Sequence, residues 1–273
     1  MVGFLDLVAS LHGLGIASGD TIMVHASLRA LRPVEGGAAG LVRALDAAVG
    51  GDGTVLMTVG ARDGCAWVND RPEAERAGLL AGTEPFDYRS TPADPDVGVL
   101  AEVFRQMPGT LASDHPEGRF AARGCLADRF LVNVPWDHYY GPGSPLERFA
   151  DARGKVLRLG SDPNTVTLLH YAEYLAEVPH KRRVRRHRLV AGVHGPEIRA
   201  VECLDDARGI VDYPEEDYFA TILNAYLRER PRTVGLVGHA RSELLDAADL
   251  VTFAAGWMTE HLVTRPPAAD RSS

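Results

Sequence analysis

The sequence predicts an α/β fold in which helices and strands alternate along the chain. Apolar residues recur at helical spacing within FLDLVASLHGLGI and again within GGAAGLVRALDAAVG. Each segment leads through a short glycine-containing turn into an apolar run typical of a buried strand, TIMV and TVLMTV respectively. A strand, a helix and a second strand joined by such short links form a parallel βαβ unit, and we expect one near the N-terminus.

The boundaries of these elements follow from glycine and proline. The first helix should end at Gly15, and the strand after it should span residues 21–24. A second helix should end at Gly50, where the turn GDG leads into the next strand. Further along, DVGVLAEVFRQMPG predicts a helix that begins at Asp96 and stops at Pro108.

The second half of the chain continues the alternation. GKVLRLG predicts a strand that ends at Gly160, and HRLV through RAVECL predicts a strand pair that turns at Gly195. An acidic segment, VDYPEEDYFATILNAYL, and the apolar segment TVGLVG follow. We expect the last helix to begin at about Ser242.

Residues 61–96 interrupt this regular pattern. They are rich in Asp, Pro, Gly and Arg, and Trp67, Phe86 and Tyr88 stand among them. A loop of that length in a compact domain is usually functional or disordered. Because aromatic residues are interspersed with acidic ones, we interpret the segment as a binding lid and not as a merely mobile loop.

Composition excludes several classes of protein. Hydrophobic residues make up 45% of the chain and charged residues 24%, as in ordinary soluble proteins. Neither a long apolar run nor a basic-then-apolar N-terminus is present, so we expect a cytoplasmic protein with no membrane partner. The net charge of -8 argues against nucleic acid as a partner and permits a cationic ligand.

The cysteines and the remaining histidines do not suggest a metal site. Cys65, Cys125 and Cys203 lie far apart, which fits reduced thiols better than disulfide bonds or a zinc site. His187 and His194 are not at metal-binding distance in sequence from any cysteine. We therefore expect no metal.

The segment DPNTVTLLHYAEY, residues 162–174, carries the most informative polar residues. It follows the carboxyl end of a predicted strand, where open α/β folds place their ligands. In a helix that begins here, Thr167 and His170 share one face, whereas Glu173 lies further round. Near a helix N-terminus the neutral imidazole is favoured, and a general base needs that form at pH 7. The alternative is a structural histidine beside an apolar stripe.

Two more histidines stand in polar surroundings. VHASLRAL puts His25, Ser27 and Arg29 after a strand and before a turn, where backbone amides and an arginine can hold phosphate. SDHPEG puts His115 beside a proline. For both histidines we favour a capping or packing role. The basic run KRRVRRHR is interpreted as a solvated strand edge in preference to a nucleic-acid contact.

An ordered set of motifs resembles the aminoglycoside 3-N-acetyltransferases. The motifs are MVHASLRAL, DVGVLAEVFRQMPG, SDHPEGRFAARG, GPGSPLERF, GKVLRLG, NTVTLLHYAE and VGLVGHARSELLDAADLV, and they cover most of the chain. The resemblance implies an enzyme that uses acetyl-CoA to acetylate the 3-amino group of 2-deoxystreptamine antibiotics, which confers resistance. It also implies the antibiotic N-acetyltransferase fold, a mixed central sheet flanked by helices, and not the common N-acetyltransferase fold.

The resemblance implies one catalytic domain over residues 1–265, with the lid around 61–96 inserted in it and a flexible tail at 266–273. The partners would be an aminoglycoside and CoA, and the chain would be a monomer or a homodimer. The catalytic roles fall on His170 as the base, on Glu215 as its partner and on Thr167. The acetyl-CoA site falls on Ser27, Leu28, Arg29, Val97, Gly98, Val99 and Ser113. The substrate site falls on Asp63, Trp67, Asp70, Glu216 and Asp217.

The implied chemistry is physically consistent. An aminoglycoside amine is largely protonated at neutral pH, so it must lose a proton before it attacks a thioester. His170 can take that proton, while Glu215 orients the ring and stabilises the imidazolium that forms. Thr167 can hydrogen-bond to the thioester carbonyl or to the oxyanion.

Two questions stay open at this point. Glu173 is nearer to His170 in the chain and could orient it instead, but we prefer Glu215 because Glu173 points round the helix toward Arg182 or Arg183. The substrate could be a different amine, or the protein could bind an antibiotic or acyl-CoA without catalysis.

Overall fold

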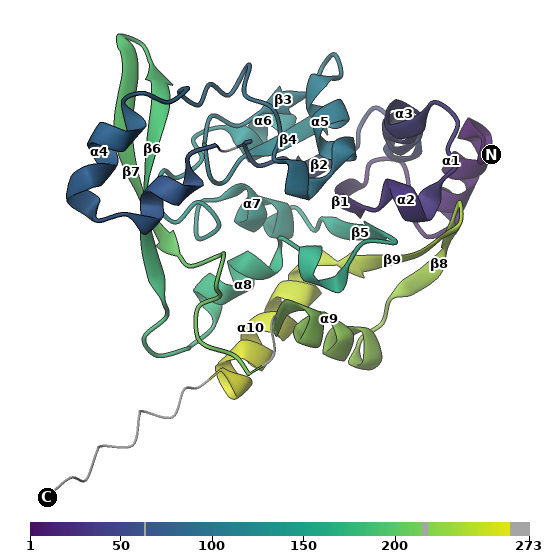
Figure 1. Cartoon of the computed structure of the whole chain (residues 1–273). Helices are drawn as coiled ribbons and strands as arrows, with labels where there is room; N and C mark the ends of the chain where they lie inside the picture. Colours follow the sequence, from purple (N-terminus) through teal and green to yellow (C-terminus); the bar gives the residue numbers. More distant parts are fainter. Residues whose placement is uncertain (63, 215–217, 263–273) are drawn as a thin grey trace, which may run out of the picture.

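The computed structural model describes residues 1–62, 64–214 and 218–262. Within these ranges, a seven-stranded sheet forms the centre and a two-stranded hairpin stands at one side of it (Figure 1). No helix in the described part of the chain has both the length and the apolar character needed to cross a bilayer.

The central sheet is mixed, as expected for this fold class. Its strands are β1 Thr21–Ala26, β2 Thr54–Thr58, β3 Leu111–Ala112, β4 Phe120–Gly124, β5 Lys155–Leu159, β8 Thr233–Val237 and β9 Ala240–Asp246. Their order across the sheet is β3-β4-β2-β1-β5-β9-β8. Strand β1 runs parallel to its neighbours β2 and β5, and the other neighbours pair antiparallel.

The predicted parallel βαβ unit is present. Strands β1 and β2 are joined through α2 Leu28–Leu31 and α3 Gly37–Val49. Helix α3 ends where expected, because Gly50 adopts a φ of 68°, which residues with a side chain rarely take. The chain then turns directly into β2.

Helices cover both faces of the sheet. One face carries α1 Phe4–Gly13, α3 and α5 Val99–Gln106, and the other carries α6 Ala127–Leu131, α7 Pro145–Asp151, α8 Leu169–Leu175, α9 Tyr218–Glu229 and α10 Ala247–His261. Successive strand residues alternate between the two cores: Ile22 and Val24 belong to the first, and Met23 to the second. Burial on both faces explains why these strands are continuously apolar.

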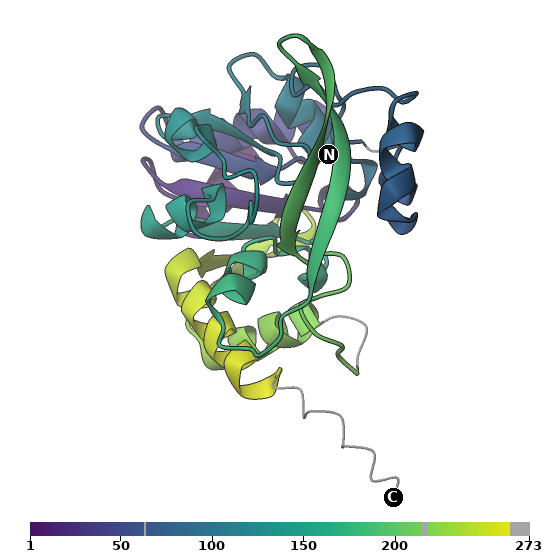
Figure 2. The same cartoon turned by 90° about the vertical axis from the view of Figure 1, so that its left-hand side faces the viewer.

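The hairpin consists of β6 Arg183–Gly192 and β7 Gly195–Leu204, and it turns at Gly195 as predicted. Figures 1 and 2 show it at the edge of the molecule with α4 Glu73–Leu80 alongside. Helix α4 belongs to residues 61–96, which also contain the short helical turns η1 Ala66–Asp70 and η2 Pro95–Val97. This segment therefore has regular structure that the sequence reasoning did not predict. Phe86 ties it to the hairpin through backbone hydrogen bonds with Leu189 and Ala191.

Several helix starts differ from the predictions. The last helix begins at Ala247, not at about Ser242, because residues 242–246 pair with β5 as part of β9. The helix expected from Asp96 begins at Val99, since Gly98 adopts a φ of 89° and separates it from η2. The segment 162–174 is likewise divided, into the turn η3 Pro163–Thr165 and α8.

Candidate active site

A cavity of about 620 Å³ lies at the carboxyl ends of β1, β2 and β5. Ligands of open α/β sheets bind at such an edge because the chain leaves adjacent parallel strands in different directions. The lining includes eight residues that the sequence reasoning had singled out: Ser27, Leu28, Arg29, Val97, Gly98, Val99, Thr167 and His170. Segments far apart in the chain thus meet at one hollow.

The turn after β1 is fixed by hydrogen bonds around Ser27. The Ser27 Oγ accepts from the Ala30 backbone N–H at 3.3 Å, and the Ser27 N–H donates to the Leu159 carbonyl at 2.9 Å. Gly160 follows with a φ of 62°, and a Cβ there would lie 2.7 Å from the Ala30 side chain. Glycine is therefore required where β5 passes the turn.

His170 lies in the first turn of α8 and faces this cavity. Its backbone N–H donates to the Thr167 carbonyl at 3.0 Å. The Thr167 Oγ1 accepts a hydrogen bond of 3.1 Å from the Oγ1 of Thr58, the last residue of β2. The hydroxyl that precedes the histidine is therefore held by a strand of the central sheet.

The partner of His170 in the structure is Glu173. The His170 Nδ1 lies 2.8 Å from Glu173 Oε2, and the Glu173 residue is only 1% exposed. The other carboxylate oxygen accepts from the Tyr218 hydroxyl, whose oxygen accepts from the Ile210 N–H at 3.0 Å. Because a carboxylate only accepts hydrogen bonds, Nδ1 carries the hydrogen and Nε2 of the neutral ring is the basic nitrogen.

The prediction that Glu173 faces away from His170 toward Arg182 or Arg183 is wrong. Residues three apart on a helix are neighbours on its surface, so the two side chains of α8 meet. Arg182 instead pairs with Asp212. Glu215, the partner that the sequence reasoning preferred, lies outside the described residues.

Two aromatic rings enclose the imidazole of His170. The Tyr140 ring stacks on it with 4.9 Å between centroids and 7° between planes. The Phe219 ring meets it edge-on, with 4.7 Å between centroids and an angle of 60°. The imidazole is thus clamped in one orientation by Tyr140, Phe219 and the bond to Glu173.

A second cavity, of about 420 Å³, meets the first at His170. Asn164, His170 and Phe219 line both cavities. The remaining lining of the second cavity is polar and carries both signs of charge: Glu173, Arg182, Asp206, Ala207, Arg208, Gly209, Val211, Asp212, Tyr213 and Tyr218. The imidazole therefore stands between two separate spaces, each large enough for part of a ligand.

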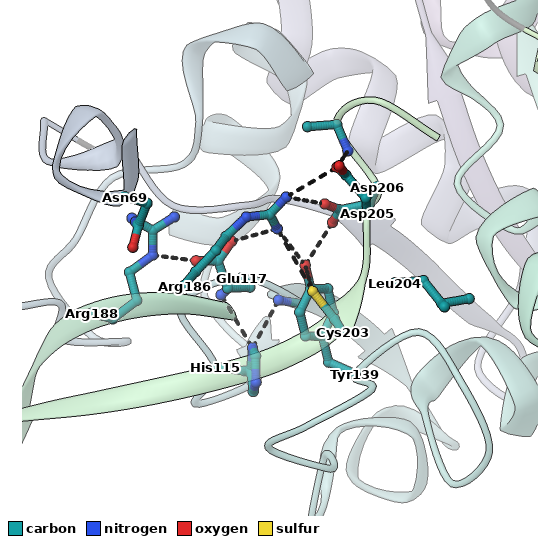
Figure 3. A network of polar contacts seen from close by, with 12 residues as sticks. Asn69, His115, Glu117, Tyr139, Arg186, Arg188, Cys203, Leu204, Asp205 and Asp206 are labelled. Atoms are coloured by element: carbon teal, nitrogen blue, oxygen red, sulfur yellow. Dashed lines mark hydrogen bonds and ion pairs between the residues drawn. The ribbon is translucent and has the colours of Figure 1, made fainter. Parts of the chain in front are cut away.

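The wall of the second cavity is supported by a buried polar network around Arg186 (Figure 3). Its guanidinium lies 2.6 Å from Asp206 Oδ1 and 3.4 Å from Glu117 Oε2. The Tyr139 hydroxyl donates to Asp206 Oδ2 at 2.6 Å. Burial by itself raises the pKa of Asp206, but the positive charges of Arg186 and His170, with hydrogen bonds from Arg186 and Tyr139, outweigh it and lower that pKa. Asp206 therefore stays ionised near His170.

This network corrects the interpretation of KRRVRRHR as a solvated strand edge. Arg186 and Arg188 have side chains only 15% and 13% exposed, and both pair with Glu117 (Figure 3). Arg185, which points to the other side of β6, is 52% exposed. Alternation along the strand places two arginines of the run inward, where they bind acidic loops distant in sequence.

Two other histidines are held neutral. His115 Nδ1 accepts from the N–H groups of Glu117 and Gly118, and its Nε2 donates to the Trp136 carbonyl at 2.8 Å. Burial is the main reason that its pKa falls to about 4. His25 lines the first cavity, and burial together with the nearby Arg158 lowers its pKa to about 4 as well.

The predicted residues thus divide into three groups. Eight meet at the first cavity, as described above. Ser113 is buried elsewhere, with its Oγ accepting from the Phe120 N–H at 2.9 Å, and neither Trp67 nor Asp70 lines either of the two cavities. Asp63, Glu215, Glu216 and Asp217 lie outside the described residues. In the part of the chain that the structure describes, no three His, Cys, Asp or Glu side chains are grouped so that they could hold a metal ion.

Sequence reasoning missed Tyr140, Tyr218 and Phe219, which surround the base. Tyr140 immediately precedes the motif GPGSPLERF, and the other two lie within the acidic segment VDYPEEDYFATILNAYL. Their position in or next to segments that carry site residues was the only local indication of a role in the site. The contacts of Tyr140 and Phe219 with His170, and of Tyr218 with Glu173, depend on tertiary structure, which no local pattern reveals.

Known proteins share both the sequence and the fold. Residues 23–259 match the sequence profile of the family described as aminoglycoside 3-N-acetyltransferase. Aminoglycoside N(3)-acetyltransferase III of Serratia marcescens is 38% identical over 267 residues, which cover 94% of this chain and 97% of the relative. A solved structure described as AAC-IIIb binary with CoASH has a TM-score of 0.90 at 37% identity, covering 97% of this chain and 99% of the other. Another, AAC-VIa bound to sisomicin, has a TM-score of 0.88 at 35% identity, covering 94% and 97%.

Proposed function

This chain belongs to the aminoglycoside 3-N-acetyltransferase family, and we propose that it transfers the acetyl group of acetyl-CoA to the 3-amino group of a 2-deoxystreptamine aminoglycoside. The product amide no longer carries the ammonium charge, which would weaken antibiotic binding to its target. The resemblance identified from the sequence motifs is confirmed by the family match and by the relatives.

The position of His170 between two cavities is the observation that supports this proposal most strongly. A direct transfer needs the thioester on one side of the base and the amine on the other. The first cavity carries the turn at Ser27 and the start of α5, which suit acetyl-CoA. The second carries Glu173, Asp206 and Asp212 beside the base, which suits a cationic amine.

In the proposed mechanism His170 is the general base. Its Nε2 takes a proton from the ammonium group of the substrate, and the amine then attacks the thioester carbonyl carbon. Glu173, bonded to Nδ1, holds the ring in the required tautomer and stabilises the imidazolium. The tetrahedral intermediate expels the CoA thiolate, which takes up a proton as the amide forms.

Acetyl-CoA is proposed to occupy the first cavity. Backbone amides of Leu28 and Arg29 and the Arg29 side chain would hold the pyrophosphate, because arginine and turn amides suit phosphate, whereas the Ser27 N–H is already bonded to Leu159. Val97, Gly98 and Val99 would line the path of the pantetheine arm toward Thr167. The CoA-bound relative is consistent with this assignment of the co-substrate.

The aminoglycoside is proposed to enter the second cavity. Residues 215–217, with the sequence Glu-Glu-Asp, stand in the chain between Tyr213 and Tyr218, and both tyrosines line that cavity. This connectivity supports a role for Glu216 and Asp217 in binding ammonium groups. We also propose that residues 61–96, with Asp63, Trp67 and Asp70, form a lid over the bound drug.

A panel assay tests the function. The purified protein is mixed with acetyl-CoA and a set of aminoglycosides that includes sisomicin, and release of the CoA thiol is recorded. Nuclear magnetic resonance then locates the new amide, which we expect on the 3-amino nitrogen. Each drug chemically acetylated at that nitrogen is the matched control and should release no thiol. Turnover only with unrelated amines would indicate a different substrate, and binding without thiol release would indicate a non-catalytic protein.

A further inference from the structure

We propose that the Tyr140 hydroxyl is a catalytic hydrogen-bond donor, which binds the thioester oxygen as negative charge develops on it. This inference rests on the proposed acetyl transfer and adds to it a residue that the motifs did not identify. Three observations support it: the Tyr140 ring packs against His170, its hydroxyl keeps its proton, and Thr167 lines the same cavity.

The Tyr140 ring is fixed beside the base. It lies flat on the His170 imidazole and meets Phe120 and Tyr139 at steep angles of 80° and 70°. Tyr140 is only 9% exposed, yet it lines the same cavity as His170. A ring packed on three sides cannot swing away, so Tyr140 is held in place in the wall of that cavity.

The hydroxyl has no partner to satisfy it within residues 1–62, 64–214 and 218–262. The neighbouring Tyr139 hydroxyl, by contrast, binds Asp206 and Arg186. The oxygen is not among the fully buried polar atoms of the described residues, and Tyr140 lines the cavity, so a ligand there can reach the hydroxyl. Burial, followed by the negative charges of Asp206 and Glu117, raises the pKa of Tyr140 well above 10. The group therefore keeps its proton and donates.

Thr167 supplies a second donor in the same cavity. Because its Oγ1 accepts from Thr58, its own hydrogen is directed elsewhere. Thr167 lies one turn before His170 and shares the cavity with Tyr140. Two hydroxyls from different segments can then bind one oxygen from two sides, which is the arrangement of an oxyanion hole.

Acetyl transfer proceeds through a tetrahedral intermediate. The nitrogen lone pair of the deprotonated amine forms a bond to the carbonyl carbon, and the π electrons of the C=O bond move to oxygen. The Tyr140 and Thr167 hydroxyls stabilise that oxyanion by hydrogen bonds without giving up their protons. The C=O bond then re-forms, and the C–S bond breaks with its electron pair on sulfur. The imidazolium of His170 gives its proton to the thiolate, and the attached nitrogen releases its second proton to solvent, which leaves the neutral amide and the CoA thiol.

Tyr140→Phe is the decisive variant, because it removes one oxygen and keeps every ring contact. We expect kcat to fall by roughly 10²–10³-fold, as when one oxyanion donor is lost. The KM values for acetyl-CoA and drug should change little, because the bond strengthens only in the transition state. The decline of activity at acid pH should persist, since His170 is untouched. Thermal stability should not fall, as no hydrogen bond of the folded chain is lost.

Tyr226→Phe is the matched control. Tyr226 is also buried, and its hydroxyl donates to Asp249 Oδ2 at 2.9 Å, outside the cavity. Its kcat should stay near that of the unmodified protein. A Tyr140→Phe enzyme with unchanged kcat would overturn the proposal. So would a rise in KM alone, which indicates ground-state binding, or loss of the acid limb, which indicates action through His170. If the unmodified protein releases no thiol with any amine, the proposed function fails instead.

Discussion

The surroundings of His170 and His115 differ in a way that explains which histidine can serve as a base. Both rings lie against aromatic neighbours, and the adjacent residues Tyr139 and Tyr140 face one histidine each. His115 is bonded through both nitrogens to the main chain. His170, by contrast, has its Nδ1 beside the carboxylate of Glu173 and borders two cavities. His115 is 1% exposed and the His170 side chain 17%, so the two rings differ both in access and in the groups that bind them.

The groups bound to the two histidines have opposite effects on protonation of the ring. Two backbone N–H groups point at the Nδ1 of His115, so protonation of that nitrogen would break both bonds. A carboxylate beside His170 instead favours the positive ring that forms during proton transfer. The main-chain hydrogen bonds of His115 therefore fit a structural role, and the carboxylate beside His170 fits the role of base that we propose for it.

Replacement of the base should have the largest effect on turnover. His170→Ala removes the group that accepts the proton, and a general base contributes about 10²–10⁴-fold. We expect kcat to fall by at least that range, and the acid limb of the pH–rate profile should disappear. Titration calorimetry should still detect binding of CoA and drug. Retention of the acid limb in this variant would show that another group accepts the proton.

Neutralisation of the orienting carboxylate should have the next largest effect. Glu173→Gln keeps the shape of the side chain but removes the charge that stabilises the imidazolium. We expect a loss of roughly 10²-fold in kcat, smaller than that of His170→Ala, because orienting carboxylates contribute less than the base. The double variant should be little slower than His170→Ala, since the two residues act as a unit.

Glu215→Gln is the companion experiment for this pair. Glu215 was the partner preferred from the sequence, and its variant measures how much of the orienting role it holds. A full loss of turnover in Glu215→Gln together with normal turnover in Glu173→Gln would contradict the assignment drawn from α8.

Replacement of the caged histidine should affect stability more than turnover. His115→Phe keeps a ring between Trp136 and Tyr139 but leaves the Glu117 and Gly118 N–H groups without their acceptor. Unsatisfied buried groups cost about 1–3 kcal/mol each, so we expect a clear decrease in the free energy of unfolding. Urea denaturation at pH 7 measures it, and kcat at permissive temperature should stay close to normal.

The same variant has a pH signature. The pKa of His115 is about 4 in the folded chain and about 6.5 when exposed, so the unfolded chain binds the proton first as pH falls. The contribution of neutral His115 to the free energy of unfolding is therefore fully present above pH 6.5. It is lost progressively as the pH falls from 6.5 to 4, by up to about 3 kcal/mol. The difference between the unmodified protein and His115→Phe should shrink over that window. Parallel curves would contradict a neutral, caged His115.

Much of the fold and part of the site could be predicted from local patterns. Apolar spacing and glycine stops located α1, β1, α3, β2 and β5, because these depend on neighbours within one or two turns. The position of Ser27 and His170 after strands followed from the same pattern. The ordered motifs identified the family, because the order of motifs along the chain can be read without knowing which residues touch in the fold.

Only tertiary structure decided which side chains meet. Tyr218 reaches Glu173 across 45 residues of chain, and Thr58 reaches Thr167 across 109. Residues 242–246 carry a helix-like pattern, yet they became a strand because β5 offered a free edge. Periodicity records which face of an element is apolar, but the choice of partner across that face depends on how the layers pack. The contact between His170 and Glu173 thus became visible only in the folded chain, whereas Glu215, which the resemblance implied, lies outside the described residues.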